Sequence, residues 1–260
     1  MSDYRWLELE RSDDGVRTLS LNKPPVNALG RELVADLNAA FSELAADDAA
    51  RCLVVRSAGK HFCAGADLKE RQGMSLDDVR AFVPQLSGAC NALAAIPYPT
   101  IAAVKGAAAG GGCELALAAD MRILAEETKI GLRETALAII PGAGGTQRLP
   151  RLIGPARAKR WIFAAELHSA ADALADGVAD RVVAADALDD TAGKLAQTIA
   201  ANGPVAVRLA KRSIEQGAAR ALAEALDLEW QCYQGVLETS DRLEALEAFA
   251  EKRPPRFKGR

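Results

Sequence analysis

The segment between Lys105 and Asp120 constrains the fold of this chain more than any other. It reads Gly-Ala-Ala-Ala-Gly-Gly-Gly-Cys-Glu-Leu-Ala-Leu-Ala-Ala, so Glu114 is the only acidic or basic residue inside it. A helix that begins at the three glycines and is apolar on every side has to be buried. A buried carboxylate without partners costs several kcal/mol or stays protonated. Glu114 is therefore either a helix-start carboxylate stabilised by the helix dipole or a group retained for proton chemistry.

The glycines that open this helix also predict a site for negative charge. The first amides of a helix have no acceptor within the helix and lie at the positive end of its dipole. Gly111 is therefore a candidate donor to a developing oxyanion. With a rise of about 1.5 Å per residue, Glu114 lies one turn further along, so the amide and the carboxylate can face one pocket.

Strand and helix patterns alternate on both sides of this segment, which favours a layered α/β core. Strands are expected at 6–10 and 16–21, joined by a turn at 13–15, and at 52–56, 100–104, 120–124 and 178–183. Helices are expected at 31–46 and 76–94, after residue 111, and at 144–152, 155–164 and 170–175. Later patterns are helical only, at 188–201, 204–216, 219–237 and 241–252. We therefore predict a core over residues 1–202 and a C-terminal helical module over 203–260, which serves packing or assembly.

The composition is that of an ordinary soluble globular protein. Half of the 260 residues are apolar, 26% are charged and the formal net charge is −3, which provides no long-range attraction for nucleic acid or an anionic membrane. Five cysteines without a C-x-x-C pair, and only two histidines, argue against a disulfide framework or a structural zinc site. The polar start and the absence of a long apolar run predict a cytoplasmic protein without a membrane span.

Several common chemistries lack their motifs. The sequence has no G-x-S-x-G, and Gly142–Gln147 breaks the G-x-G-x-x-G pattern at its last position. The glycines at 106–112 are not followed by the Lys-Ser/Thr of a phosphate loop. What remains is two further glycine-rich segments, His61–Lys69 and Gly131–Gly145. Taken alone, the first is more simply a tight surface turn, and Glu134 in the second more simply a surface residue.

Together, however, the three segments closely resemble the enoyl-CoA hydratase (crotonase) family. The resemblance rests on A-G-A-D-L-K-E at 64–70, G-G-G-C-E-L-A at 110–116 and P-G-A-G-G-T-Q-R-L at 141–149. It implies an α/β, crotonase-like spiral of ββα repeats with a C-terminal helical oligomerisation module, assembled as a homotrimer or a homohexamer. It also implies addition of water to a 2-enoyl-CoA thioester to give a 3-hydroxyacyl-CoA, with coenzyme A as part of the substrate and no cofactor or metal.

The resemblance assigns roles to individual residues. Glu114 and Glu134 match the two catalytic glutamates of the hydratases, Ala66 and Gly111 match the oxyanion-hole amides, and Gly142 matches an amide that positions the water. Isomerases of the family usually lack one of the two glutamates, so hydration is favoured. We expect Glu114 to act mainly on water and Glu134 mainly on the α-proton, with shared roles left open. Coenzyme A and substrate contacts are expected from Ala64, Asp67, Leu68, Lys69 and Lys252.

Other interpretations concern the substrate and the partners. The stretch 65–71 with Met74 resembles methylglutaconyl-CoA hydratases, in which case Arg71 would meet a distal substrate carboxylate; otherwise Arg71 is a solvated loop residue. Lys252 either reaches a CoA phosphate across a subunit boundary or is a solvated helix end. Some relatives bind RNA through a lysine-rich helix. The matching segment 31–51 has two arginines, no lysine and five acids, so we expect no nucleic-acid binding.

Overall fold

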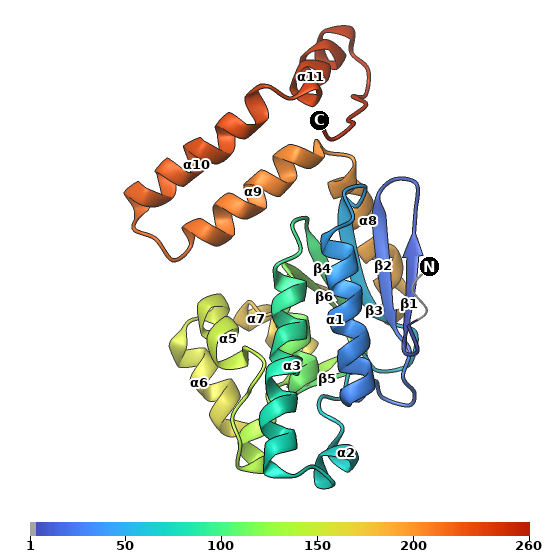
Figure 1. Cartoon of the computed structure of the whole chain (residues 1–260), viewed down its shortest axis with the longest axis vertical. Helices are drawn as coiled ribbons and strands as arrows, with labels where there is room; N and C mark the ends of the chain where they lie inside the picture. The colour runs from blue at the N-terminus through green and yellow to red at the C-terminus, as the bar shows by residue number, and fades with distance from the viewer. Residues whose placement is uncertain (1–3) are drawn as a thin grey trace.

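The computed structural model of the chain describes residues 4–260, and its core is a six-stranded sheet in the order β1-β2-β3-β4-β6-β9 (Figure 1). β1 and β2 form an antiparallel hairpin, and the remaining neighbours are parallel. Its strands are β1 (Leu7–Arg11), β2 (Val16–Leu21), β3 (Cys52–Ser57), β4 (Thr100–Val104), β6 (Met121–Ala125) and β9 (Arg181–Val183). A smaller sheet contains β5 (Ala107–Ala109), β7 (Lys129–Gly131) and β8 (His168–Ser169).

The helices lie on both faces of the larger sheet and extend beyond it at the C-terminal end (Figure 1). They are α1 (Arg31–Ala45), α2 (Leu68–Gln72), α3 (Leu76–Ala94), α4 (Gly111–Ala118), α5 (Gly145–Ile153), α6 (Pro155–Ala164), α7 (Ala170–Asp176), α8 (Leu188–Ala200), α9 (Pro204–Gly217), α10 (Leu222–Leu237) and α11 (Ser240–Glu251). The 3-10 helices are η1 (Glu134–Leu137) and η2 (Ala185–Ala187).

Alternate residues of the larger sheet pack against different helices. In β3, Leu53 and Val55 join the hydrophobic core that includes the apolar faces of α1 and α3. Cys52 and Val54 belong to a second cluster, in which α8 supplies the covering residues. Successive side chains of a strand point to opposite faces, so the apolar run of β3 reflects burial on both sides.

The structure confirms the predicted alternation of strands and helices, and the largest shifts in element ends occur at two places. The last strand begins at Arg181, not at Val178, because the Val178 and Ala179 amides donate to Ala173 O and close the end of α7. α10 begins at Leu222, after a turn in which the Arg220 amide donates to Gly217 O.

The smaller sheet positions α4 and was not expected from the sequence. β5 leads into α4 and pairs with β7, and the Gly110 amide donates to Gly131 O at the end of that pairing. Every residue of α4 is buried, as its apolar sequence predicted. The start of α4, the end of β7 and the segment after it are thereby brought together.

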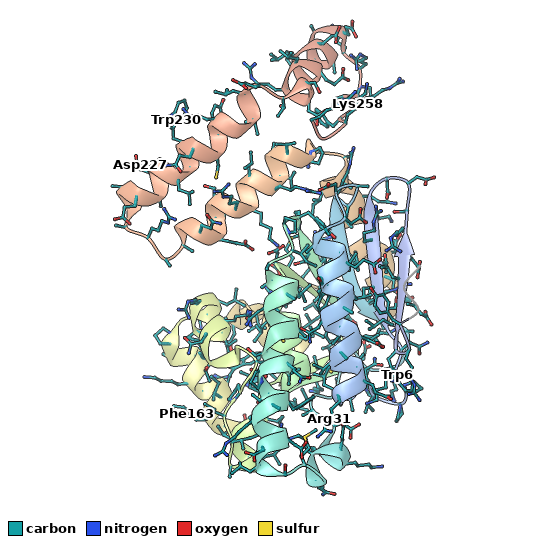
Figure 2. All side chains as sticks on the ribbon, viewed as in Figure 1. Trp6, Arg31, Phe163, Asp227, Trp230 and Lys258 are labelled. Carbon is teal, nitrogen blue, oxygen red and sulfur yellow. The ribbon has the colours of Figure 1, made fainter. Side chains whose placement is uncertain are left out.

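The C-terminal helices α9, α10 and α11 extend away from the sheet (Figure 1). The ammonium of Lys211 on α9 anchors them to the core, because it donates to Asp120 Oδ2 at 2.7 Å and to Tyr98 O at 3.3 Å. The side chains of α10, with Trp230 among them, stand clear of the sheet (Figure 2). Within residues 4–260, no helix combines the length and apolar character needed to cross a bilayer.

Candidate active site

Glu114 lies inside the protein with its carboxylate held by a neighbouring loop. The side chain is only 2% exposed. Its Oε1 accepts hydrogen bonds from the Ala143 amide at 2.7 Å and the Gly145 amide at 2.8 Å. Burial raises the pKa of Glu114 above its ordinary value, and the two amide donors oppose that rise. The partners are therefore loop amides, and Oε2 accepts no hydrogen bond within residues 4–260.

Glu134 begins η1 and lies against the start of α4. A Cβ placed on Gly110 would be 3.0 Å from Glu134 Oε1, so the carboxyl group packs on the backbone that opens the helix. Glu134 Oε2 is buried without a hydrogen-bond partner. Burial, and then the negative charge of Glu114, raise the pKa of Glu134 to about 7. The two carboxyl groups thus influence each other but have different surroundings.

Two backbone amides without acceptors lie beside these carboxyl groups. The Ala66 nitrogen is 3.9 Å from the position of a Cβ on Gly111, which places the two residues next to each other. Neither Ala66 N nor Gly111 N donates to an acceptor within residues 4–260. Gly65 has φ +88°, and a Cβ there would be 2.5 Å from Ala109 O, so only glycine allows this approach. Leu29 fixes the turn, because its amide donates to Gly65 O at 2.8 Å.

The residues of the turn that follows the Ala66 amide have separate environments. Leu68 and Lys69 are exposed on α2, where they are available to a ligand. The Asp67 carboxylate caps α2 by accepting from the Glu70 amide, and it also accepts from Lys23 Nζ at 3.3 Å. Its contacts within the chain are therefore those of a helix cap. The exposed Ala64 uses its amide within the chain, as a donor to Val26 O.

Gly142 and Lys252 complete the set of predicted site residues. Gly142 is exposed and directly precedes Ala143, so it lies beside the loop amides that hold Glu114. Lys252 caps α11 in the left-handed conformation with φ +55°. α11 and α2 are at opposite ends of the molecule (Figure 1). One chain therefore does not bring Lys252 to the carboxyl pair, and a reach across a subunit boundary stays a prediction.

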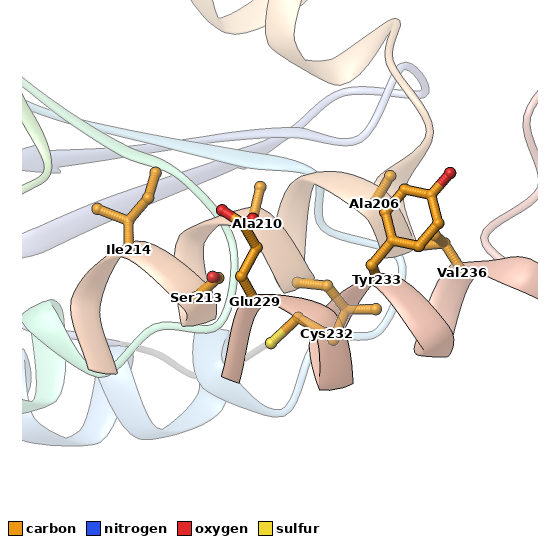
Figure 3. A pocket seen from close by; sticks show the side chains of 9 residues that line it. Ala206, Ala210, Ser213, Ile214, Glu229, Cys232, Tyr233 and Val236 are labelled. Atoms are coloured by element: carbon orange, nitrogen blue, oxygen red, sulfur yellow. The ribbon is translucent and has the colours of Figure 1, made fainter. Parts of the chain in front are cut away.

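A separate groove lies between α9 and α10, away from the carboxyl pair. Its volume is about 400 Å³, and Figure 3 shows its largely apolar lining, which includes Ile214, Cys232, Tyr233 and Val236. Glu229 is the one acidic residue in this lining. The residues that line this groove include no pair of carboxyl groups.

Sequence reasoning did not identify the amides of Ala143 and Gly145 as partners of Glu114. Backbone donors leave no side-chain pattern, and the only signal was the run of glycines in P-G-A-G-G. A buried carboxylate, a second carboxyl group with a pKa near 7 and two free amides are suited to proton transfer next to a developing oxyanion. Within the described residues, no cluster of histidine, cysteine, aspartate or glutamate side chains has the arrangement of a metal site.

Known proteins are similar to this chain in sequence and in architecture over nearly its whole length. A family model described as Enoyl-CoA hydratase/isomerase matches residues 11–260. The chain is 44% identical over 253 residues to the probable enoyl-CoA hydratase 2, mitochondrial, of Arabidopsis thaliana, which covers 96% of this chain and 84% of that protein. It is also 44% identical over 263 residues to methylglutaconyl-CoA hydratase, mitochondrial, of Homo sapiens. That alignment covers 99% of this chain and 78% of the human protein. A crystal structure of an enoyl-CoA hydratase from Bacillus anthracis matches with a TM-score of 0.96 and 44% identity, covering 98% of this chain and 100% of that one.

Proposed function

Because this chain belongs to the enoyl-CoA hydratase/isomerase family and is an enzyme of the hydro-lyase class, we propose that it adds water to a 2-enoyl-CoA thioester to give a 3-hydroxyacyl-CoA. Its fold is accordingly the crotonase-like spiral with a C-terminal helical region. The observation that carries the proposal is the unequal carboxyl pair. Glu114 has two amide donors, whereas Glu134 has an unpartnered buried oxygen and a pKa of about 7. Such a pair divides naturally into a base and an acid.

The free amides explain how the double bond becomes reactive. With the thioester oxygen between Ala66 N and Gly111 N, electron density that leaves the β-carbon accumulates on an oxygen with two donors. Gly111 adds the positive end of the α4 dipole. Donors of this kind stabilise the charge that develops in the transition state more than the neutral substrate. The β-carbon then accepts the oxygen of water.

The carboxyl groups supply the proton transfers. The Glu114 carboxylate accepts a proton from water while the water oxygen bonds to the β-carbon, and the π electrons of the double bond move toward the thioester as an enolate. The protonated Glu134 then gives its proton to the α-carbon, which restores the thioester carbonyl. Water has been added as a hydroxyl group and a proton. Return of the proton from Glu114 to Glu134, directly or through solvent, completes the cycle.

Deuterium incorporation tests hydration against isomerisation. In deuterated water, the wild-type enzyme should convert crotonyl-CoA into a 3-hydroxy product that carries solvent deuterium at the α-carbon. An isomerase moves a proton within the substrate and makes no 3-hydroxy product. A double-bond shift without hydration, measured by mass spectrometry and NMR of the product, would refute the proposal.

Methylglutaconyl-CoA is the second candidate substrate, because a relative named for that activity is as similar as the one named for enoyl-CoA hydration. Arg71 lies in α2, partly exposed, beyond the turn that carries the Ala66 amide. If Arg71 binds the distal carboxylate, Arg71→Met should raise KM for methylglutaconyl-CoA while leaving that for crotonyl-CoA unchanged. A parallel assay of both thioesters decides which substrate is used better.

The proposed active form is a homotrimer or a homohexamer that assembles through the C-terminal module, and we place it in the cytoplasm. The support is a set of large apolar side chains that the chain leaves exposed: Leu222, Leu226, Trp230, Leu243, Leu246 and Phe249. Light scattering at micromolar concentration should give a mass well above 27.4 kDa. A monomer under these conditions would exclude this assembly and any contribution of Lys252 across a subunit boundary.

A further inference from the structure

Arg148 on α5 makes contacts that bear directly on the surroundings of Glu114. Its Nη1 donates to Ala143 O at 2.9 Å, and its Nη2 donates to Asn91 Oδ1 on α3 at 2.7 Å. A Cβ on Gly144 would be 2.0 Å from Nη1, so the guanidinium lies directly against this glycine. Gly144 has φ +108°, a conformation that favours glycine. Arg148 therefore links α3 to the segment from Ala143 to Gly145.

The same segment is the one that holds Glu114. The Ala143 residue donates its amide to Glu114 Oε1 and accepts at its carbonyl from Arg148. Gly145, one residue beyond the glycine covered by the guanidinium, supplies the second amide to Glu114. A change in the conformation of Ala143 or Gly144 would therefore move both donors relative to the carboxylate.

Arg148 also supplies the positive charge that affects the pKa of Glu114. The negative charge of Glu114 adds to the effect of burial in raising the pKa of Glu134 on η1 and of two nearby thiols. Burial raises the pKa of Cys90 on α3 to about 12 and that of Cys113 on α4 well above its ordinary value, so both thiols are neutral. The positive charge of Arg148 lowers the pKa of Glu114 and opposes the effect of burial.

We propose that Arg148 is a positioning residue that holds the Ala143–Gly145 segment in place, and with it the two amides that donate to the Glu114 carboxylate. The catalytic part of this inference rests on the proposed hydration activity, whereas the effect on Glu114 itself does not. A guanidinium suits the role because its planar fork can donate to Ala143 and Asn91 together.

Titration of Glu114 tests the inference without reference to turnover. In protein labelled with ¹³C at glutamate side chains, the Glu114 carboxyl signal is assigned by its loss in Glu114→Gln. A Glu134→Gln background removes the coupled titration of the second carboxyl group. In that background, Arg148→Gln should move the Glu114 titration to higher pH. The matched control is Arg151→Gln, because Arg151 lies one turn along α5 and, within residues 4–260, its side chain donates hydrogen bonds only to Gln147.

Kinetics in the otherwise wild-type enzyme test the positioning role. Small misplacements of catalytic groups and loss of supporting contacts reduce rates by roughly 10- to 100-fold, and we expect Arg148→Gln to lower kcat for crotonyl-CoA hydration by about that factor with little change in KM. Arg148→Lys keeps the charge but not the fork, so it should lower kcat while the Glu114 titration stays close to that of the parent. Arg151→Gln should alter neither quantity.

The outcomes separate this inference from the proposed function. A folded Arg148→Gln protein with parental kcat and a parental Glu114 titration would overturn the role of Arg148 and leave hydration intact. If Arg148→Gln does not fold, Arg148→Lys decides: parental kcat overturns the inference, and reduced kcat with a parental titration supports it. A wild-type enzyme that hydrates no 2-enoyl-CoA would refute the proposed function, and the titration of Glu114 would still test Arg148.

Discussion

The proposed active site and the C-terminal arm, which consists of α9, α10, α11 and the residues after them, each contain a buried carboxylate that accepts from two backbone amides, but the two carboxylates use their oxygens differently. In the arm, Asp241 accepts from the Lys258 amide with Oδ1 and from the Gly259 amide with Oδ2, at 2.6 and 2.7 Å. In the proposed active site, both amides donate to Oε1 of Glu114. Asp241 therefore uses both oxygens to hold the end of the chain, whereas Oε2 of Glu114 accepts no hydrogen bond within residues 4–260.

The two regions also differ in how they cover apolar surface. Every side chain of α4 is buried by the chain itself. On α10, only Leu228 and Cys232 are buried, and Leu222 is 75% exposed. Exposed apolar surface of this extent is typical of contacts between proteins. The residues around Glu114 are thus covered within one chain, whereas α10 leaves large apolar side chains exposed.

A large effect should come from the proposed active site, where Ala66→Pro removes one amide that we assign to the thioester oxygen. Loss of one such donor typically reduces the rate by about 10²–10³, so kcat should fall by that amount in a protein with wild-type circular dichroism. Ala66→Gly keeps the amide and is the matched control, with most of its activity retained. Near-normal kcat in a folded Ala66→Pro protein would remove Ala66 from the site.

In the C-terminal arm, a smaller effect is expected, and it concerns stability and not the rate. Asp241→Asn places a side-chain NH₂ against a backbone amide, because one of the two acceptor oxygens is lost. A buried donor left unsatisfied costs about 1–3 kcal/mol, so urea denaturation should show a loss of stability in that range. kcat should stay close to the wild-type value. A large loss of activity with unchanged stability would mean that the two carboxylates do not have separate roles.

A further effect is the pH dependence of stability from Glu134. Its pKa is raised from 4.5 in the unfolded chain to about 7 in the folded protein. Between these values the folded protein retains a proton that the unfolded chain releases, so the free energy of unfolding decreases as pH rises through this window. Glu134→Gln removes that dependence. Urea denaturation at pH 5 and pH 8 should therefore show a greater gain for the variant at pH 8; an equal difference at both values would contradict the raised pKa.

Much of the larger sheet and its helices could be predicted because their signals are local. The buried positions of α1 recur at Leu33, Leu37, Phe41 and Leu44, which is the helical period. The smaller sheet was missed because its strands are two or three residues long and find their partners far along the chain, as when Ala107 pairs with Lys129. Short segments carry too little periodicity for their pairing to be recognised.

In the candidate site too, some features could be predicted from side chains, whereas the backbone contacts could not. Glu114 was recognisable because a single acid in an apolar helix is costly to bury. Glu134, Ala66 and Gly142 became candidates only through the family resemblance. The donors from Ala143 and Gly145, and the contact between Arg148 and Ala143 O, depend on a loop conformation around Gly144. No pattern of residue types along the sequence indicates these backbone contacts.

The central claim is that the two carboxyl groups act as base and acid in one addition, and the kcat values of Glu114→Gln, Glu134→Gln and the double variant test it most directly. General acid–base catalysis contributes roughly 10²–10⁴ per group, so each single change should lower hydration of crotonyl-CoA by about that factor while binding of a non-reacting thioester is retained. Because both groups serve one step, the double variant should lose much less than the product of the two effects. If Glu114→Gln hydrates at the wild-type rate while Glu134→Gln is inactive, one glutamate suffices and the account is wrong.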